Sequence, residues 1–233
     1  MKRKNNTKRN VIILACACLG IIIGAAYMFF FSALLVGNDT KYVYIDNDDT
    51  IDSVYTKLSE FSSKGTQMTG FKMLVNNSKY ADNIRTGRYA VRPGEGSFVV
   101  FRHLKNGLQT PVNLVVPSVR TVDRLAAEFS KKLMLDSATI YHALADEATC
   151  QKYGYDTATI AAMFIPNTYD IYWNVSTEKL LDRMHKECKR FWNAERKEKA
   201  QAMKLSPVEV STLASIIDEE TANDGEKPMV AGM

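Results

Sequence analysis

The chain has 233 residues, of which 46% are hydrophobic and 24% are charged, and its formal net charge is +4. The first ten residues contain five cations and no acid, and subtracting these five from +4 leaves −1 for residues 11–233. A nearly neutral chain of this kind excludes an extended basic surface for nucleic acid, so we expect no nucleic-acid partner.

The first predicted element is a membrane anchor over residues 11–36, preceded by a basic tail over residues 1–10. No charged residue occurs from Val11 to Val36. A helix of this length would extend about 39 Å, which is enough to cross a hydrocarbon core of roughly 30 Å with some tilt. The cations before it predict a single pass with a cytoplasmic N-terminus, so that the bulk of the chain is extracytoplasmic.

Two alternatives to an anchor remain for this segment. A cleaved signal peptide is one, but the apolar run exceeds the usual secretory core, and residues 32–36 offer no clear small-x-small cleavage site. Lipidation at Cys16 is the other, and it is disfavoured because few apolar residues precede this cysteine and many follow it. Cys16 and Cys18 are therefore interpreted as ordinary membrane-embedded residues.

Residues 40–116 are predicted to form a small α+β module with a core of its own. The run Asp48-Asp49-Thr50 supplies capping oxygens for its first helix, Gly70 weakens the second, and Gly107 is a left-handed cap for the third. The predicted strands are 41–45, 87–91 and 111–116, and the predicted helices are 51–61, 68–76 and 97–104. Nothing in this module indicates catalysis.

Residues 117–233 are predicted to be mainly helical, which makes the fold class of the whole chain α+β. Ser206, Pro207 and Glu209 form a capping box with proline at the first helical position, and they predict the start of a helix that carries residues 213–221. The other expected helices are 121–133, 137–145, 157–164, a long basic helix over 177–204 that is broken at most once, and a new helix from Pro228.

An aromatic and polar run between Phe164 and Trp173 interrupts this helical pattern. Aromatic rings stack on the apolar faces of sugars, while amide and carboxylate groups bind sugar hydroxyls. We therefore predict a substrate-binding loop that contains Asn167, Thr168 and Tyr169. The alternative, a proline turn that caps the core, remains open.

No metal and no cofactor is predicted. His142, Cys150, His185 and Cys188 do not have the spacing of a common zinc module. The sequence contains no GxSxG elbow, P-loop or HExxH motif, and its glycines do not form a dinucleotide fingerprint. Cys150 and Cys188 permit one disulfide in an oxidising compartment, and two separate buried thiols are the alternative.

The last long predicted helix carries three consecutive acids in an apolar context. Its sequence from residue 213 is Leu213-Ala214-Ser215-Ile216-Ile217-Asp218-Glu219-Glu220-Thr221. At about 100° per residue, Glu220 shares a face with Leu213, Ile216 and Ile217, whereas Asp218 and Glu219 rotate away from it. A carboxyl set against hydrocarbon has a raised pKa and suits a general acid near neutral pH. Glu220 is therefore the candidate catalytic acid, and a solvated helix end is the alternative.

Several features together resemble the endolytic murein transglycosylases, the YceG-like family, over nearly the whole chain. They are the basic N-terminus with one anchor, the runs Thr-Gly-Arg-Tyr (86–89) and Leu-Lys-Asn-Gly (104–107), the loop Phe-Ile-Pro-Asn-Thr-Tyr (164–169), and the run 213–221. The resemblance implies that residues 40–116 are a LysM-like module and that residues 117–233 begin a catalytic domain. It also implies that Glu220 is catalytic, with Asp218 and Ser215 in support. Two positions depart from the family pattern, because Asp218 stands where the family has Glu and Asn167 where it has Asp.

The resemblance further implies cleavage of the β-1,4 bond between N-acetylmuramic acid and N-acetylglucosamine in peptidoglycan, which leaves 1,6-anhydro ends. One carboxyl serves as acid and then as base in this scheme, in contrast to the two-carboxylate hydrolases. The implied substrates are nascent glycan strands at the inner membrane of a bacterial cell, and the implied partners are membrane-bound peptidoglycan synthases. Because family members continue beyond the position of Met233, we expect a truncated, incomplete catalytic domain.

Two other functions remain open from the sequence. The first is a non-catalytic, membrane-anchored protein that binds glycan or acts as a scaffold, in which Glu220 is a structural acid. The second is a water-using muramidase, which needs a second carboxylate opposite Glu220, and Asp170 is the only modest candidate for it.

Overall fold

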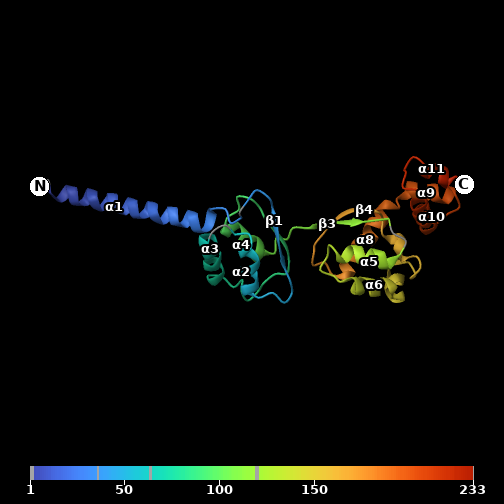
Figure 1. The fold of residues 1–233 in the computed structure, drawn as a ribbon, viewed down its shortest axis with the longest axis horizontal. Coiled ribbons are helices and arrows are strands. Elements are labelled where there is room, and N and C mark those ends of the chain that lie inside the picture. The colour runs from blue at the N-terminus through green and yellow to red at the C-terminus, as the bar shows by residue number, and fades with distance from the viewer. Residues whose placement is uncertain (1–2, 36, 63–64, 119–120, 233) are drawn as a thin grey trace. The chain divides into compact units, whose positions relative to one another are not determined.

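The computed structural model describes residues 3–35, 37–62, 65–118 and 121–232 (Figure 1). The chain divides into two compact units, Met1–Thr110 and Pro111–Met233. Helices predominate in both units, and among the described residues each unit has one small antiparallel sheet of two strands. The predicted α+β class is therefore confirmed.

Unit 1 begins with a long apolar helix. α1 spans Arg3–Ala26 and is followed directly by a π-helical turn, η1, at Tyr27–Phe31. The part from Arg9 to Phe31 has a mean hydropathy of 2.6 and is long and apolar enough to cross a membrane. The predicted anchor over 11–36 extends too far, however, because Leu34 and Leu35 are buried in the core of unit 1.

The rest of unit 1 packs three helices against two strands. The elements are β1 (Lys41–Ile45), α2 (Ile51–Ser59), α3 (Gly65–Asn76), β2 (Gly87–Val91) and α4 (Ser97–Asn106). The strands pair antiparallel, and Val43 of β1 lies opposite Tyr89 of β2. Both of these side chains turn inward, because successive residues of a strand point to opposite faces. They meet buried side chains of the helices in one core, among them Val54, Leu58, Phe71, Val75, Val100 and Leu104.

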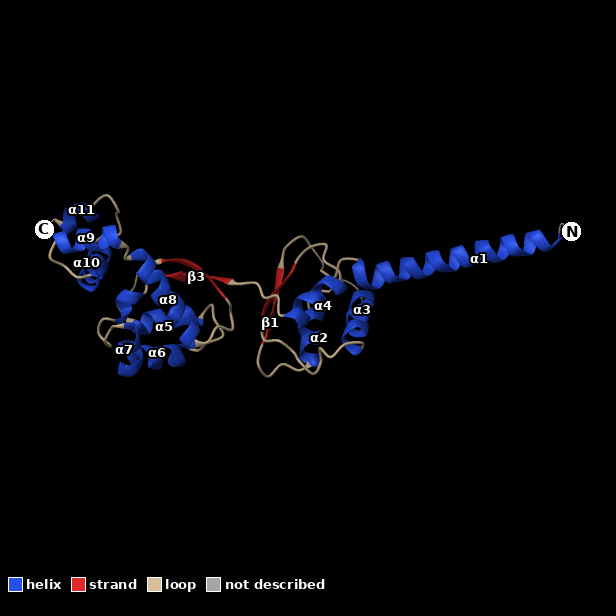
Figure 2. Ribbon diagram, turned by 180° about the vertical axis from the view of Figure 1, so that it is seen from behind, coloured by secondary structure: helices blue, strands red, loops and turns tan. Residues whose placement is uncertain are grey.

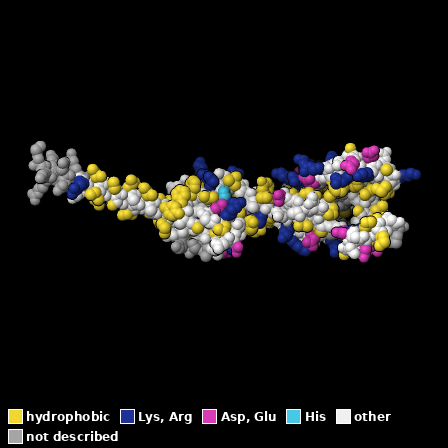
Figure 3. Space-filling model, turned by 90° about the horizontal axis from the view of Figure 1, so that it is seen from above, with side chains coloured by type: hydrophobic (Ala, Val, Ile, Leu, Met, Phe, Trp, Pro, Cys, Tyr) yellow, Lys and Arg dark blue, Asp and Glu magenta, His cyan; other side chains and the backbone are white. Residues whose placement is uncertain are grey.

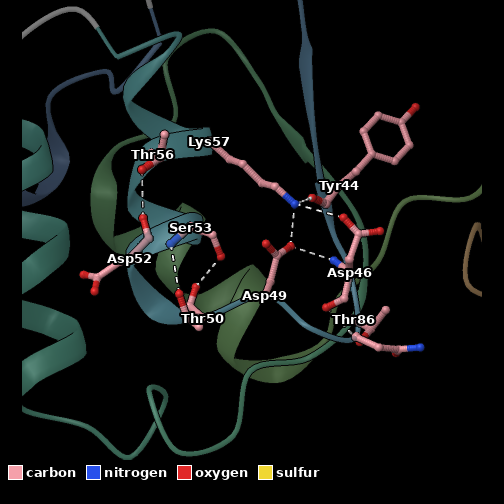
Figure 4. A network of polar contacts seen from close by, with 10 residues as sticks. Tyr44, Asp46, Asp49, Thr50, Asp52, Ser53, Thr56, Lys57 and Thr86 are labelled. Atoms are coloured by element: carbon pink, nitrogen blue, oxygen red, sulfur yellow. Dashed lines mark hydrogen bonds and ion pairs between the residues drawn. The ribbon is translucent and has the colours of Figure 1, made fainter.

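The turn between β1 and α2 is fixed by one charged side chain. Lys57 of α2 donates hydrogen bonds to the carboxylates of Asp46 and Asp49 and to the backbone oxygen of Tyr44 (Figure 4). Asp49 also accepts a hydrogen bond of 2.7 Å from the backbone N–H of Asp46, and only 7% of its side chain is exposed. These bonds hold the start of α2 against the end of β1.

Two helix caps in unit 1 confirm their sequence-based predictions. The hydroxyl of Thr50 accepts a hydrogen bond of 3.3 Å from the backbone N–H of Ser53 at the start of α2. Gly107 ends α4 with φ of 67°, in the left-handed region that a side chain would disfavour.

Unit 2 is a group of helices beside a second antiparallel strand pair (Figure 2). β3 (Val112–Val116) pairs with β4 (Asn167–Ile171), and Leu114 lies opposite Tyr169. The helical elements are α5 (Val122–Ser130), α6 (Ser137–Ala145), α7 (Glu147–Tyr153), the 3-10 turn η2 (Ile160–Met163), α8 (Thr177–Phe191), α9 (Ala194–Ala202), α10 (Pro207–Glu220) and α11 (Lys227–Ala231). The inner faces of both strands and of α5 to α8 form a single core.

Three expectations for this part of the chain differ from the structure. The strand 111–116 is predicted to close the small module, but β3 pairs within unit 2, so the boundary follows Thr110. The expected helix over 157–164 is a turn followed by η2, and the short helix α7 has no counterpart in the prediction. The expected loop over 165–172 contains β4, because pairing with β3 fixes these residues in an extended conformation.

Candidate functional site

The candidate catalytic motif lies on α10, and the start of this helix confirms its prediction. The hydroxyl of Ser206 accepts a hydrogen bond from the backbone N–H of Glu209, and the carboxylate of Glu209 accepts one from the backbone N–H of Ser206. Pro207 occupies the first helical position. Unlike α5 or α8, α10 contains no buried residue, so its side chains are partly or fully exposed along its length.

A hollow of about 680 Å³ lies in unit 2 along one side of α10. This volume is within the range of sites that hold small molecules or short saccharides. Its walls include the segment before β4 (Phe164, Ile165, Pro166), the junction of α8 and α9 (Phe191, Trp192, Arg196), the end of α9 (Met203), and α10 (Ser211, Ala214, Ser215, Ile216, Asp218). Residues that follow β3 and residues in and just before η2 complete them.

Both predicted supporting residues, Ser215 and Asp218, line this hollow. The hydroxyl of Ser215 donates a hydrogen bond of 2.8 Å to the backbone oxygen of Thr212, which leaves its lone pairs available to a ligand. The carboxylate of Asp218 forms an ion pair with Lys227 of α11. Hydrogen bonds from Lys227 and Ser118 lower the pKa of Asp218 below its ordinary value. Asp218 is therefore an ionised hydrogen-bond acceptor at neutral pH and not a proton donor.

The environment predicted for Glu220 is wrong. Glu220 is exposed at the last position of α10, and it does not line the hollow. Of the three apolar residues expected to shield it, Leu213 and Ile216 are themselves 46% and 40% exposed, and Ile217 is half-buried. Helical periodicity correctly places these apolar residues and Glu220 on one face, and only Ile216 of that face lines the hollow. No described part of the chain buries Glu220, so the apolar enclosure expected for the catalytic acid is missing.

The middle acid of the motif has a weak partner. Glu219 lies 3.9 Å from the guanidinium of Arg124 on α5, and both side chains are largely exposed. An exposed pair at this distance contributes roughly 0–1 kcal/mol. The three acids therefore have three different surroundings. Asp218 lies at the hollow and pairs with Lys227, Glu219 lies near Arg124 of α5, and Glu220 is exposed to solvent.

The predicted substrate-binding residues lie on β4 and not on a loop. Asn167 and Thr168 are exposed, and the amide oxygen of Asn167 accepts a hydrogen bond of 2.8 Å from the backbone N–H of Thr168. Tyr169 is buried in the core, and its hydroxyl donates a hydrogen bond of 2.8 Å to the backbone oxygen of Ile165. None of these three lines the hollow, whereas the residues just before them do. Asp170 is exposed on the same strand.

The walls of the hollow include aromatic and cationic residues that have no place among the sequence-based candidates. Phe191 and Trp192 lie where α8 ends, and their rings meet edge to face at 5.4 Å. The guanidinium of Arg196 lies 4.2 Å from the centre of the Phe191 ring and donates to the backbone oxygen of Phe191. Adjacent aromatic residues followed by the capping Asn193 were the available signal, because they mark a break in a basic helix beside two aromatic rings.

The two cysteines of unit 2 are separate buried thiols. Cys150 and Cys188 are both free and buried, so the alternative of two separate thiols holds in this structure. Burial raises the pKa of both thiols, which keeps them protonated and unreactive. Among the described residues, no group of three or more His, Cys, Asp or Glu side chains gathers as metal ligands would.

Fold and site together define an α+β protein that has one helix of membrane-spanning length and a polar and aromatic hollow beside a three-acid helix. The model of the YceG-like family matches residues 43–233, and the chain belongs to this family. The similar solved structures include a YceG-like protein from Listeria monocytogenes, which is 18% identical, with a TM-score of 0.47 over 82% of this chain and 67% of that one. A comparison with curated proteins finds no match.

Proposed function

We propose that the protein is an endolytic peptidoglycan lytic transglycosylase. It cleaves the β-1,4 bond between N-acetylmuramic acid and N-acetylglucosamine and leaves 1,6-anhydro-muramyl ends. The observation that carries this proposal is the match to the YceG-like family over residues 43–233, which includes the whole three-acid motif on α10. The motif resembles that of the family's endolytic murein transglycosylases, in which the acid at the position of Glu220 is catalytic.

In the proposed reaction, Glu220 first donates its proton to the glycosidic oxygen while the bond between that oxygen and C1 of the muramyl sugar breaks. The resulting carboxylate then takes the proton from the C6 hydroxyl of the same sugar, and the C6 oxygen forms a bond to C1. Atoms and charge balance, because the proton given in the first step is recovered in the second. A single carboxyl is sufficient, since no water molecule attacks.

The exposure of Glu220 sets a condition on this mechanism. No described residue encloses this carboxyl, so the bound glycan itself has to cover it. Leu213 and Ile216 form an exposed apolar surface beside Glu220 on which a sugar ring can lie. The hollow, which Ile216 also lines, offers Asp218 as an acceptor for hydroxyl groups and Trp192 as an aromatic wall. We propose that the glycan contacts both sides of the helix end.

The proposed location follows from the apolar helix. α1 and η1 are long enough to cross a membrane, and the five cations before Val11 favour a cytoplasmic N-terminus. The rest of the chain would then act outside the inner membrane of a bacterial cell, on glycan strands that leave membrane-bound synthases. By resemblance, the module that follows the anchor is LysM-like and holds or spaces the strand, and the synthases are partners.

The exposure of Glu220 favours a second candidate, an anchored glycan-binding or scaffold protein without catalysis. Purified full-length protein incubated with sacculi separates the two. An enzyme releases fragments with anhydro-muramyl ends, and Glu220→Gln abolishes this release while Glu219→Gln, which changes the neighbouring exposed acid, preserves it. Binding without release supports the scaffold. Reducing ends instead of anhydro ends would indicate a muramidase, with Asp170→Asn as the variant to test.

A further inference from the structure

The end of the apolar helix is built into unit 1 without a linker. A Cβ atom on Gly70 of α3 would lie 2.0 Å from the backbone oxygen of Phe29, and one on Gly96 would lie 2.5 Å from that of Phe30. Real Cβ contacts are not this short. The backbone of η1 therefore lies directly on the backbones of α3 and of the N-terminus of α4, at two positions that only glycine allows.

A chain of hydrogen bonds ties the same three elements together. The Ser32 hydroxyl donates to the backbone oxygen of Met28 (2.6 Å) and accepts from the side-chain amide of Gln67 (2.9 Å). The backbone oxygen of Gln67 accepts from the hydroxyl of Ser97 (2.6 Å). Gln67 and Ser97 are only 3% and 0% exposed. Buried polar bonds of this kind fix geometry, because opening them leaves unpaired groups away from water.

The residues that follow η1 enter the core at once. The backbone N–H of Leu34 donates to the oxygen of Glu95 (2.8 Å), and Ala33 forms a bridge with Gly96. Leu34 is 1% exposed and belongs to the core cluster of unit 1. Unit 1 is thus held rigidly at the end of its apolar helix, in contrast to a domain on a flexible tether.

A bilayer crossed by the apolar helix would have its surface at the level of this rigid joint. The apolar run from Val11 to Phe31 is about 31 Å long as a helix, and a bilayer hydrocarbon core is about 30 Å thick. When Val11 lies at one boundary of the core, η1 lies at the other. Because α3 and α4 pack on η1, their adjoining surfaces lie at that boundary too.

The side chains at the joint have the composition of a membrane interface. Tyr27, Phe31, Met73 and Phe98 are 61%, 54%, 45% and 40% exposed. The rings of Phe31 and Phe98 lie 5.9 Å apart, which joins η1 to α4 in one aromatic surface. Figure 3 shows hydrophobic side chains gathered where the apolar helix meets the body of unit 1. Aromatic residues concentrate at the boundary between lipid tails and headgroups.

We propose that the surface formed by Tyr27, Phe31, Met73 and Phe98 is a lipid-binding surface on which unit 1 lies against the outer side of the bilayer. The partner is the headgroup and upper acyl region of the lipids. Part of the extracytoplasmic module is therefore embedded, and the module has a fixed height above the hydrocarbon core. This inference rests on the proposed membrane anchoring, and it predicts a contact that anchoring alone does not require.

Single tryptophan substitutions in the full-length protein, reconstituted in phosphatidylcholine bilayers, test this contact. Phe98→Trp places the probe on the proposed surface. Leu108→Trp is the matched control, since Leu108 is 53% exposed and follows the opposite end of α4, about 15 Å along the helix. Leu19→Trp, in the middle of α1, reports anchoring itself. The unsubstituted protein gives the background of the native tryptophans, and acyl chains brominated near the headgroup or near their ends are the quenchers.

The proposal predicts that the emission added by Phe98→Trp is mostly lost with lipids brominated near the headgroup, while that added by Leu108→Trp is retained. Emission added by Leu19→Trp is quenched by lipids brominated near the chain ends. If Leu19→Trp is quenched and Phe98→Trp is no more quenched than Leu108→Trp, the lipid-binding surface is refuted and the anchor stands. If Leu19→Trp is not quenched either, the membrane anchor and the lipid-binding surface are both refuted. All three positions are exposed, so each substitution is compatible with folding.

Discussion

Gly70→Ala is expected to loosen the joint between the apolar helix and unit 1. The added methyl group would lie 2.0 Å from the backbone oxygen of Phe29 and 2.8 Å from its carbonyl carbon. Neither atom can move aside by a change of side-chain rotamer, because both belong to the backbone. The helix end must therefore shift away from α3, and the hydrogen bonds that depend on close contact weaken with it.

The size of the effect follows from two opposing contributions. Overpacking a tight contact costs about 1–3 kcal/mol, and a clash with backbone atoms belongs at the upper end of this range. Alanine is favoured over glycine inside a helix by about 1 kcal/mol. The net destabilisation of the joint is therefore about 2 kcal/mol, which corresponds to roughly thirtyfold in the equilibrium between closed and open forms.

Hydrogen exchange measured on peptides covering residues 27–35 reports this opening. The backbone N–H of Leu34, which donates to Glu95, is expected to exchange about thirtyfold faster in Gly70→Ala than in the unsubstituted protein. Gly65→Ala is the matched control on the same helix, because a Cβ there has no neighbour within 4 Å. Gly65→Ala is expected to leave the exchange unchanged or slower.

Equal exchange in Gly70→Ala and Gly65→Ala would refute the reasoning. It would mean that α3 and η1 are not in backbone contact in the membrane-bound protein. The rigid joint, and with it the fixed height of the module, would then have no basis.

Three further outcomes are expected. Lys57→Met should lower the free energy of unfolding of unit 1 by about 1–3 kcal/mol, measured by denaturant titration, because it leaves the nearly buried carboxylate of Asp49 without its main donor. Burial raises the pKa of Asp49, but hydrogen bonds from Lys57 and Ser53 outweigh it and hold that pKa below its ordinary value. Stability from this group is therefore present above about pH 4 and lost as pH falls further, and this dependence should flatten in Lys57→Met. Ser206→Ala should cost about 1 kcal/mol and speed hydrogen exchange in the first turn of α10, whereas Ser211→Ala in the same helix should not.

Local chemistry in the sequence predicts helix and turn boundaries well in this protein. Thr50, Gly107 and the pair of Ser206 and Glu209 act at the positions expected of them, because capping depends on residues within one turn of each other. The β4 segment has no such local signal. Its extended conformation comes from pairing with β3, some fifty residues earlier, and the polar residues Asn167 and Thr168 resemble a loop until that partner is known.

The same distinction explains the two glycines of the joint and the acid of the motif. Sequence reasoning treats Gly70 only as a weak point of a helix, whereas in the structure it is the place where another backbone lies against α3. Periodicity likewise groups Glu220 with Leu213 and Ile216 but does not say what covers their shared face.

Since no described residue buries that face, activity of the protein depends on whether the glycan covers it, and Leu213→Ser is the direct test. If the apolar surface shields the acid, this substitution should lower kcat for release of anhydro ends, whereas Glu219→Gln, which changes an exposed residue of α10 that does not line the hollow, should leave kcat unchanged. An unchanged kcat in Leu213→Ser would refute the proposed shielding.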